Sequence, residues 1–211
     1  MAVAAGQPIL SVRGLTRRFG DQQVVRDFDL SVTEGERVAL RGPNGSGKTT
    51  ILRCITGALL PSAGEVQVDG HMAGTEAANR LVGASLSQER SFYLRLTGRE
   101  NLLFFAQLRH ESRAAALDQV RALEEELEIA HIAAKRLDRC STGMLQQMAL
   151  ARALLGEPRV FVLDEPTRSL DDAAIARLWG ALERRPDAAV LIATHRPDDL
   201  DHCHRRIDFP V

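Results

Sequence analysis

The nine residues GPNGSGKTT, at positions 42–50, constrain the fold of this chain more than any other stretch. They fit the spacing G-x-x-x-x-G-K-[ST], follow a short strand pattern and open a helix pattern, which is the setting that a phosphate-binding loop requires. The glycines let backbone amides wrap phosphate groups, Lys48 offers a point charge to the terminal phosphates, and the Thr49 hydroxyl can bind Mg²⁺. We predict that a phosphate-bearing ligand binds residues Gly42, Pro43, Asn44, Gly45, Ser46, Gly47, Lys48, Thr49 and Thr50.

Strand patterns surround this loop and return in the last third of the chain. The early ones cover residues 9–15, 24–32, 37–42 and 65–70. The later runs RVFVLDE and AVLIATH are nearly all apolar, as buried parallel strands are, and a helix pattern separates them from about Leu170 to Arg184. This alternation predicts an α/β fold with its ligand at the carboxyl ends of the strands.

Helical patterns fill the stretch between these two halves. Thr97 and Glu100 have the spacing of a capping box, and apolar residues line one face of the following helix, at Leu117, Val120, Leu123 and Leu127. We place the acidic run Glu124, Glu125 and Glu126 on the solvated side of that helix. The predicted organisation is an α/β core at residues 1–88 and 157–211 and a helical subdomain at residues 89–156.

Composition limits the possible classes of partner and location. The chain has 211 residues, 45% of them hydrophobic, which suits one large domain or a core with a smaller subdomain. A net charge of -1 argues against a strongly basic surface, so we expect no nucleic acid partner. Three scattered cysteines, Cys54, Cys140 and Cys203, do not suit a disulfide framework and favour a reducing, cytoplasmic location. No stretch resembles a signal peptide or a membrane span.

Polar residues follow the two late apolar runs. Asp164 and Glu165 end the first, where Asp164 could hold Mg²⁺ through its water shell and Glu165 could polarise an attacking water as general base. His195 ends the second and could donate to a transferred phosphate. The run HCH at 202–204 does not suggest a metal site, because adjacent residues converge poorly on one ion; we expect surface positions near a last strand.

The run CSTGM, residues 140–144, precedes a long apolar helix pattern. Its first turn presents backbone N–H groups without intrahelical partners, so Ser141, Thr142 and Gly143 form either an ordinary helix cap or an anion site. This stretch alone does not decide between the two.

Together these motifs resemble those of the nucleotide-binding subunit of an ATP-binding cassette (ABC) transporter, and the resemblance covers nearly all of the chain. CSTGM stands where the family has its LSGGQ signature, and Gln88 resembles the Q-loop glutamine. The resemblance implies a P-loop NTPase core with a mostly parallel sheet, an N-terminal antiparallel β portion and an inserted α-helical subdomain. It also implies that ATP and Mg²⁺ bind, with Mg²⁺ near Thr49, Gln88 and Asp164, catalysis by Glu165, His195, Lys48 and Gln88, and a D-loop at Ser169, Leu170 and Asp171.

In this family two cassettes pack head to tail, so the resemblance implies a second nucleotide-binding subunit, here a homodimer. Ser141, Thr142 and Gly143 would then contact ATP held by the partner chain. Each site would join the complete phosphate-binding loop of one chain to the isolated anion-binding helix end of the other chain. Two-fold pairing would therefore form two such sites.

The sequence departs from the family pattern at several positions. Phe19 stands where the family usually has a Tyr that stacks on adenine, and it keeps the aromatic face without the hydroxyl. Thr142 and Met144 replace a Gly and a Gln of the signature, and Gly143 is kept where backbone approaches phosphate most closely. Arg168 and Ser169 stand where Ser and Gly are common. We expect function to survive these changes.

The expected function is that of an ATP-hydrolysing subunit that drives a separate transmembrane permease from the inner face of the membrane. The run STGM and residues 91–105 resemble cassettes of the type-2 exporter class, which move polysaccharides, lipids, drugs or natural products outward. The alternatives are a haem-exporter cassette of cytochrome c maturation, suggested by the short C-terminus, and a soluble ABC ATPase without a transport role. A non-hydrolysing scaffold is disfavoured by Glu165 and His195.

Residues 89–105 should form much of the dock for a cytoplasmic helix of the permease. Aromatic residues make up only 4% of the chain and gather in this stretch. We expect Phe104 or Phe105 in the core, because a helix buries one face, and Phe92 and Tyr93 facing outward.

Overall fold

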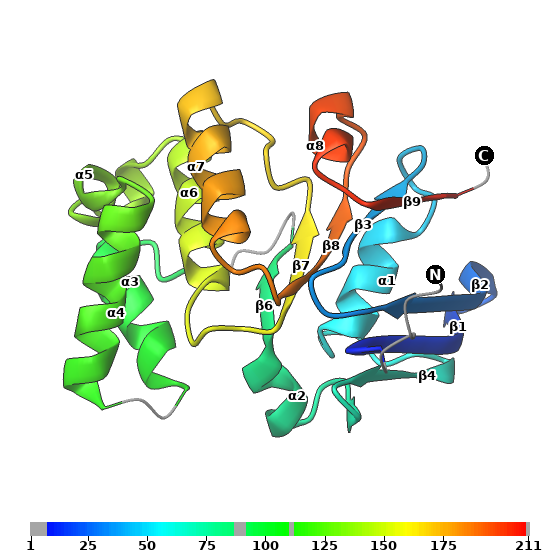
Figure 1. Ribbon diagram of the computed structural model, residues 1–211. Helices are drawn as coiled ribbons and strands as arrows, with labels where there is room; N and C mark the ends of the chain where they lie inside the picture. The colour runs from blue at the N-terminus through cyan, green and yellow to red at the C-terminus, as the bar shows by residue number, and fades with distance from the viewer. Residues whose placement is uncertain (1–7, 87–91, 110–111, 210–211) are drawn as a thin grey trace, which may run out of the picture.

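The computed structural model of the chain describes residues 8–86, 92–109 and 112–209. Figure 1 shows the helices of the middle of the chain on the left, a parallel sheet in the centre and the N-terminal strands on the right. The phosphate-binding loop lies where the centre meets the right-hand part, between β3 (Arg37–Arg41) and α1 (Lys48–Ile55). The helix predicted to start at Lys48 is therefore confirmed.

The central sheet is parallel, with strand order β6-β7-β8-β3-β9. Every residue of β7 and β8 is buried because both faces of this sheet are covered, which explains their continuous apolar sequence. On β7, Phe161 packs with the helical side and Val162 with the side of the N-terminal strands. The bounds of the strands other than β3 are β6 Val82–Ser85, β7 Val160–Asp164, β8 Ala189–Ala193 and β9 Arg205–Asp208.

The second sheet is antiparallel, with strand order β2-β1-β4-β5. Helix α1 lies between the two sheets, and its buried residues Ile51 and Leu52 belong to the core that both sheets share. The expected N-terminal antiparallel portion is confirmed. Its strands are β1 Leu10–Phe19, β2 Gln22–Val32, β4 Ala63–Val68 and β5 His71–Met72.

The helical part of the chain begins after β6, and its buried residues share one core with α7 and one face of the central sheet. The predicted capping box is present: Thr97 Oγ1 accepts from the Glu100 N–H at 3.2 Å, and Glu100 Oε2 accepts from the Thr97 N–H at 2.7 Å. The predicted apolar face also holds, since Val120, Leu123 and Leu127 are buried. The elements are α3 Gly98–Gln107, α4 Arg113–Glu126, α5 Ala130–Ala133, the 3₁₀ turn η1 Leu137–Arg139 and α6 Thr142–Ala153.

Three further helices complete the fold. Helix α7 (Asp172–Glu183) confirms the predicted helix between the late strands, while α2 (Glu76–Leu81) and α8 (Pro197–Asp201) were not predicted. Strands β5 and β6 were also missed, because elements of six residues or fewer carry too little periodicity. Among the described residues, no helix is long and apolar enough to cross a bilayer.

The prediction that the acidic run faces solvent is wrong for two of its three residues. Glu124 is buried and forms a two-pronged ion pair with Arg99 of α3, whose Nε lies 2.7 Å from Glu124 Oε1. Only Glu125 is exposed. The charge pattern of α4 does not reveal this, because the cation comes from another helix.

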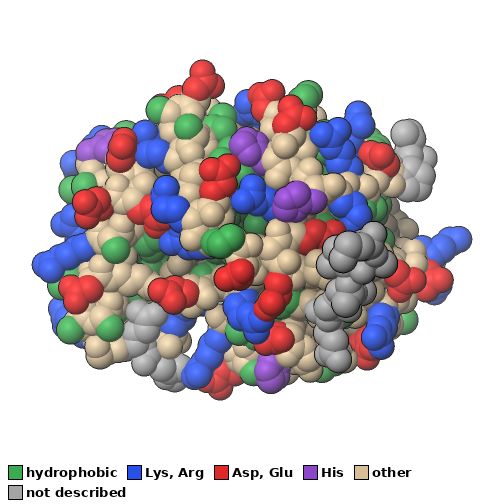
Figure 2. Space-filling view, viewed as in Figure 1, with side chains coloured by type: hydrophobic (Ala, Val, Ile, Leu, Met, Phe, Trp, Pro, Cys, Tyr) green, Lys and Arg blue, Asp and Glu red, His purple; other side chains and the backbone are tan. Residues whose placement is uncertain are grey.

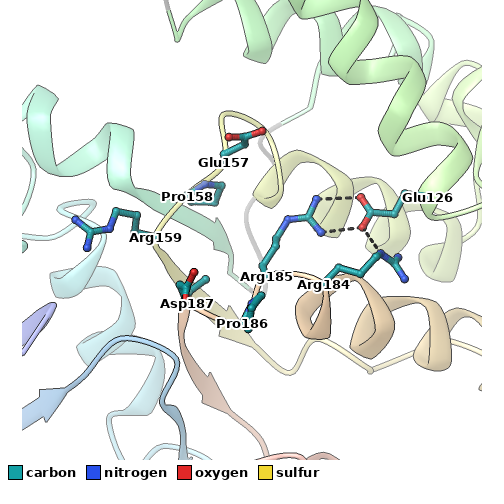
Figure 3. Close-up of a pocket in the computed structure, with 9 residues that line it drawn as sticks. Glu126, Glu157, Pro158, Arg159, Arg184, Arg185, Pro186 and Asp187 are labelled. Carbon is teal, nitrogen blue, oxygen red and sulfur yellow. Dashed lines mark hydrogen bonds and ion pairs between the residues drawn. The ribbon is translucent and has the colours of Figure 1, made fainter.

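Glu126 is the second exception, and its partners come from the end of α7. Its carboxylate accepts from Arg185 at 2.8 and 2.9 Å and from Arg184 at 2.9 Å (Figure 3). The hydrogen bond from Arg185 is the main cause of a lowered pKa of Glu126, and the pairing with Arg184 adds to it. These arginines line a cavity of about 440 Å³ together with Glu157, Pro158, Arg159, Pro186, Asp187 and Ala188, at the amino ends of β7 and β8.

The structure also tests the predicted positions of several aromatic and histidine side chains. Phe92 does not face outward: it packs against the helical core, 6.2 Å from Phe105 in an edge-to-face pair. Phe105 packs against the same core, as predicted, and Tyr93 is 52% exposed. His202 stacks on Trp179, and the two ring centroids are 4.1 Å apart. Its ring is therefore not simply exposed at the surface, as we had expected.

The face of the molecule in Figure 2 carries basic and acidic side chains interspersed, without a region of a single sign. This mixture agrees with the net charge of -1. Among the described residues all three cysteines are free thiols.

Candidate nucleotide site

The phosphate-binding loop ends in a glycine that no other residue can replace without strain. Gly47 is the N-cap of α1 with φ of 96°, in the left-handed region that favours glycine. A Cβ at this position would lie 2.9 Å from the Val24 carbonyl oxygen of β2. No side chain caps the start of α1, so its first-turn amides stay available to a ligand.

A cavity of about 480 Å³ opens over this helix start. The structure thus brings most of the predicted loop together with both predicted carboxylates, although the latter lie more than a hundred residues away in sequence. The lining residues are Val24, Asn44, Gly45, Gly47, Lys48, Thr49, Thr50, Asp164, Glu165 and Arg168.

Lys48 is turned into the loop. Its ammonium group donates to the carbonyl oxygens of Gly42 and Pro43, each at 2.8 Å, and the residue is only 8% exposed. A lysine that is already desolvated and held over the loop by neutral acceptors can exchange these acceptors for phosphate oxygens with a small movement.

Thr49 and Asp164 form a pair of oxygen ligands at the floor of the cavity. The Thr49 hydroxyl donates to Asp164 Oδ2 at 2.8 Å, and Asp164 is 3% exposed at the end of β7. Mg²⁺ takes hard oxygen ligands and usually one or two from protein, with phosphate and water oxygens completing the octahedron. These two residues fit that role. Among the described residues no cluster of three or more His, Cys, Asp or Glu could hold a metal by itself.

Glu165 and His195 form a second pair at the same sheet edge. Glu165 Oε1 lies 2.8 Å from His195 Nδ1, and because a carboxylate only accepts, Nδ1 carries the hydrogen in this pair. The other oxygen, Oε2, is buried and has no hydrogen-bond partner among the described residues. Glu165 has φ of 47°, a left-handed conformation that is uncommon for non-glycine residues.

A second cavity, of about 390 Å³, continues the first toward His195. The two cavities share Asn44, Glu165 and Arg168, and the second adds Ser169, His195 and Arg196. A nucleotide's terminal phosphates in the first cavity would therefore have Glu165 and His195 beside them.

Comparisons with known proteins agree with this geometry. A family model described as ABC transporter matches residues 25–168. This chain belongs to the ABC transporter family. It is similar to an uncharacterised ABC transporter ATP-binding protein of Bacillus subtilis, YdbJ, at 36% identity over 95% of this chain and 66% of YdbJ. The daunorubicin resistance ATP-binding protein DrrA3 of Streptomyces coeruleorubidus is 34% identical over 94% of this chain and 64% of its own length.

A solved structure titled as the ATP-binding subunit of an ABC transporter has 28% identity and a TM-score of 0.87, over 95% of this chain and 85% of that one. The predicted ABC cassette fold and the predicted ATP-binding subunit are thus confirmed. The chain spans about two thirds of the length of the two curated relatives named above.

The residues at the position of the ABC signature do not line either cavity. Ser141 is the N-cap of α6, and its hydroxyl accepts from the Met144 N–H at 3.3 Å. A Cβ on Gly143 would lie 2.4 Å from the carbonyl oxygen of Ser169 in the same chain. Gly143 is therefore required by a contact with the chain's own D-loop, a reason that the sequence does not reveal.

The segment predicted to be a D-loop carries a non-glycine residue in a conformation that favours glycine. Ser169 has φ of 64°, at the position where the sequence comparison with the family pattern expected Gly. Asp171 caps α7 through a hydrogen bond from the Ala174 N–H at 2.8 Å. Leu170, between them, packs against the helical core.

One further predicted residue, Phe19, does not line the phosphate cavity. Phe19 ends β1, is 47% exposed and has the Arg17 guanidinium over its ring at 4.5 Å from the centroid. The Arg17 cation thus lies over one face of a ring that is about half exposed. Gln88 lies outside the described residues.

Sequence reasoning missed several residues of this site. Val24 lines the cavity from β2, and Gln146 of α6 donates to the Pro166 carbonyl oxygen at 3.0 Å, just after Glu165. Asp199 is a fully buried acid behind the Glu165–His195 pair. An acidic residue on a short helix normally faces water, so no sequence signal distinguished Asp199 from Asp198 or Asp201.

Proposed function

We propose that this chain hydrolyses ATP and that its hydrolysis drives transport through a membrane partner. The observation that carries the proposal is the adjacency of two pairs, Thr49 with Asp164 and Glu165 with His195, in cavities that share lining residues. The first pair is suited to hold a metal-bound triphosphate, and the second is suited to activate water beside it.

The chemistry follows from the atoms available. The α1 amides and Lys48 bind the phosphates, and Lys48 replaces its loop carbonyl contacts with phosphate oxygens. Thr49 and Asp164 would hold Mg²⁺, whose charge would offset the negative charge of the phosphates. The free Oε2 of Glu165 accepts the proton of the attacking water, while Oε1 stays bound to His195. His195 presents its second ring nitrogen to the transferred phosphate.

The Glu165→Gln variant tests this assignment. It keeps the size of the side chain and removes the base, so it should bind ATP with unchanged affinity and lose turnover by about 100-fold or more. Phosphate release and fluorescent-nucleotide binding measure the two quantities. Hydrolysis near the wild-type rate would remove Glu165 from the role, and a wild-type chain without Mg²⁺-dependent turnover, alone and with its membrane partner, would refute ATP hydrolysis.

We also propose that two copies of the chain pair around ATP. The capped start of α6 offers amides of its first turn, yet it lines neither of the two cavities beside the phosphate-binding loop, so an anion bound there would come from another chain. Glu165→Gln with ATP should run as a dimer by light scattering, and adding Ser141→Arg should return it to a monomer. A monomer in both cases at micromolar protein would refute the shared site.

The surface for the membrane partner is proposed just before and at the start of α3. Tyr93, Leu94 and Leu96 are 52%, 48% and 37% exposed, and buried Asn101 binds the Tyr93 backbone by accepting at 2.8 Å and donating at 3.1 Å. A separate cavity of about 310 Å³ lies toward the other end of the same helix, and its lining includes Phe105, Leu108, Arg109, Arg152 and Leu155.

Tyr93→Ala with Leu94→Ala should leave ATP binding intact and reduce recovery of the permease in a pull-down, because exposed aromatic anchors dominate such interfaces at about 2 kcal/mol or more each. Met72→Ala is the matched control, an apolar side chain of similar exposure, 47%, on β5 of the antiparallel sheet. Undiminished recovery of the permease would show that this surface is not the dock.

We infer export as the direction of transport and the inner face of the membrane as the location, through the permease. The support is the similarity to the daunorubicin resistance protein DrrA3, together with the signature variant STGM. Sealed inverted vesicles that contain the chain and its permease should accumulate the cargo when ATP is added outside. Accumulation only in right-side-out vesicles loaded with ATP would instead indicate import.

A further inference from the structure

Asp199 is a buried acid that the proposed chemistry does not use directly. It lies in α8, four residues after His195, and is 1% exposed, whereas the side chains of Asp198 and Asp201 on the same helix are 79% and 78% exposed. Its Oδ2 atom accepts two hydroxyl hydrogen bonds, from Thr167 at 2.8 Å and from Thr194 at 2.7 Å.

The two threonines belong to the two loops that carry the reacting groups. Thr167 follows Glu165 by two residues, and Thr194 immediately precedes His195; both are fully buried. Because Glu165 and His195 are themselves in contact at 2.8 Å, Asp199 closes a ring that joins the end of β7 to the end of β8.

Arg196 adds a second set of links across the same two loops. Its guanidinium donates to the Thr167 carbonyl oxygen at 3.2 Å, and its backbone N–H donates to the Thr194 hydroxyl at 3.1 Å. The Thr194 oxygen thus accepts from Arg196 while its hydrogen points to Asp199, so the hydroxyl has a single orientation.

The surroundings of the Asp199 carboxylate do not suit a role in stabilising the fold. Its second oxygen, Oδ1, is buried without a hydrogen-bond partner among the described residues. Burying a carboxylate that is only half satisfied costs free energy, and an apolar residue would fill the space at lower cost. Asp199 also lines neither of the two cavities, so a direct contact with nucleotide is not its role.

We propose that Asp199 is a positioning residue, which sets the spacing between Glu165 and His195 for ATP hydrolysis by holding Thr167 and Thr194. Removing its carboxylate leaves two buried hydroxyls without an acceptor and lets the two loops separate. Hydrolysis is sensitive to displacements below 1 Å at the reacting groups, whereas binding by the α1 loop does not depend on this spacing. The inference rests on the ATP hydrolysis proposed above.

The test compares turnover with nucleotide affinity in matched variants. Asp199→Ala should lower kcat by about 10- to 100-fold with KM for ATP within about twofold of wild type. Asp199→Asn retains an oxygen that can accept both hydroxyls, so it should restore most of kcat. Asp201→Ala removes an exposed carboxylate from the same helix and should leave both parameters unchanged.

A double-mutant cycle separates positioning from general destabilisation. In a His195→Ala background, where the pair is already absent, Asp199→Ala should cost far less than it costs in wild type. If Asp199→Ala does not fold, Thr167→Val and Thr194→Val each remove one hydroxyl of the same ring and should show the same fall in kcat at constant KM.

Three results would overturn the inference: a kcat for Asp199→Ala equal to that of Asp201→Ala, a parallel rise of KM, or a loss that is fully additive with His195→Ala. A wild-type chain with no Mg²⁺-dependent turnover refutes the proposed hydrolysis itself, and the positioning role with it. The wild-type measurement therefore tells the two failures apart.

Discussion

Two helix starts, those of α1 and α6, contain glycine for different reasons. At α1, Gly47 is the N-cap itself, no side chain caps the turn, and the amides face a cavity. At α6, Ser141 caps the turn and Gly143 lies inside the helix against Ser169. The first glycine makes room for a ligand and the second for the chain's own backbone. The glycine thus serves ligand binding at one helix start and internal packing at the other.

The two helix starts also differ in how directly they contact the segment that carries Glu165. Gly143 and Gln146 of α6 both contact the segment that follows Glu165, through Ser169 and Pro166. A displacement of α6 therefore reaches the catalytic edge directly, whereas the start of α1 is fixed between two sheets. We expect substitutions at α1 to affect binding and substitutions at α6 to affect turnover.

The largest effect is expected for Gly47→Ala. The new Cβ would meet the Val24 carbonyl at 2.9 Å, and φ of 96° disfavours any side chain, so ATP affinity should fall about 30- to 100-fold. Equilibrium binding of a fluorescent ATP analogue measures it. Gly45→Ala is the control, with φ of 84° but open space around its Cβ, and it should cost clearly less. Equal losses would show that backbone strain, and not the Val24 contact, limits the position.

Gly143→Ala should be the next largest and should act on turnover. A Cβ placed 2.4 Å from the Ser169 carbonyl forces the D-loop to move, so kcat should fall about tenfold while ATP affinity stays. Steady-state kinetics test whether kcat falls while the affinity for ATP stays unchanged. Gly180→Ala, in α7, meets only the flexible end of Arg184 at 3.4 Å and should leave kcat unchanged. A fall in affinity for Gly143→Ala would contradict the division between the two helix starts.

The ion pairs of Glu126 with Arg184 and Arg185, at the end of α7, should have a smaller effect, on the stability of the fold, and this effect should depend on pH. Arg185 lowers the pKa of Glu126 below its ordinary value of 4.5, so the pair stabilises the fold fully above that pH and loses its contribution as pH falls through the lowered pKa. Glu126→Gln should cost about 1 to 2 kcal/mol at pH 7, since Arg184 is 55% exposed, and the deficit should shrink on acidification.

Thermal unfolding from pH 7 to pH 3 measures this difference. Glu125→Gln, at the exposed neighbour, is the control and should follow wild type throughout. A deficit for Glu126→Gln that is constant over this range would show that packing, and not charge, holds α4 to α7.

The smallest effect is expected for Ser169→Gly. Relief of the left-handed conformation, worth about 1 to 2 kcal/mol, is partly offset by the entropy of glycine, so stability should rise by about 0.5 kcal/mol. Glu157→Gly, with φ of 49°, should give a similar gain outside the site. Melting temperatures compare the two. A loss of stability at Ser169 alone would mean that the serine side chain contributes to the contact with α6.

Much of the fold and the phosphate cradle could be predicted because the causes are local. The spacing of glycines around Lys48 sets a loop that ends in a helix, and continuous apolar runs such as β7 and β8 belong to strands covered on both faces. The capping box at Thr97 is equally local, and it is present. Asp164, Glu165 and His195 were predicted to meet because the carboxyl ends of parallel strands share one edge of the sheet.

Only the tertiary structure decided the contacts between segments that are distant in sequence. The burial of Asp199 and Glu124 and the ion pairs of Glu126 depend on partners from other loops and helices, and a residue's own neighbours in sequence do not record such partners. The reason for Gly143 is likewise a carbonyl 26 residues away, at Ser169. Sequence patterns report the local conformation and the sidedness of an element. Whether a charge is hydrated or held, and whether a glycine faces a ligand or the backbone, depends on which elements pack together.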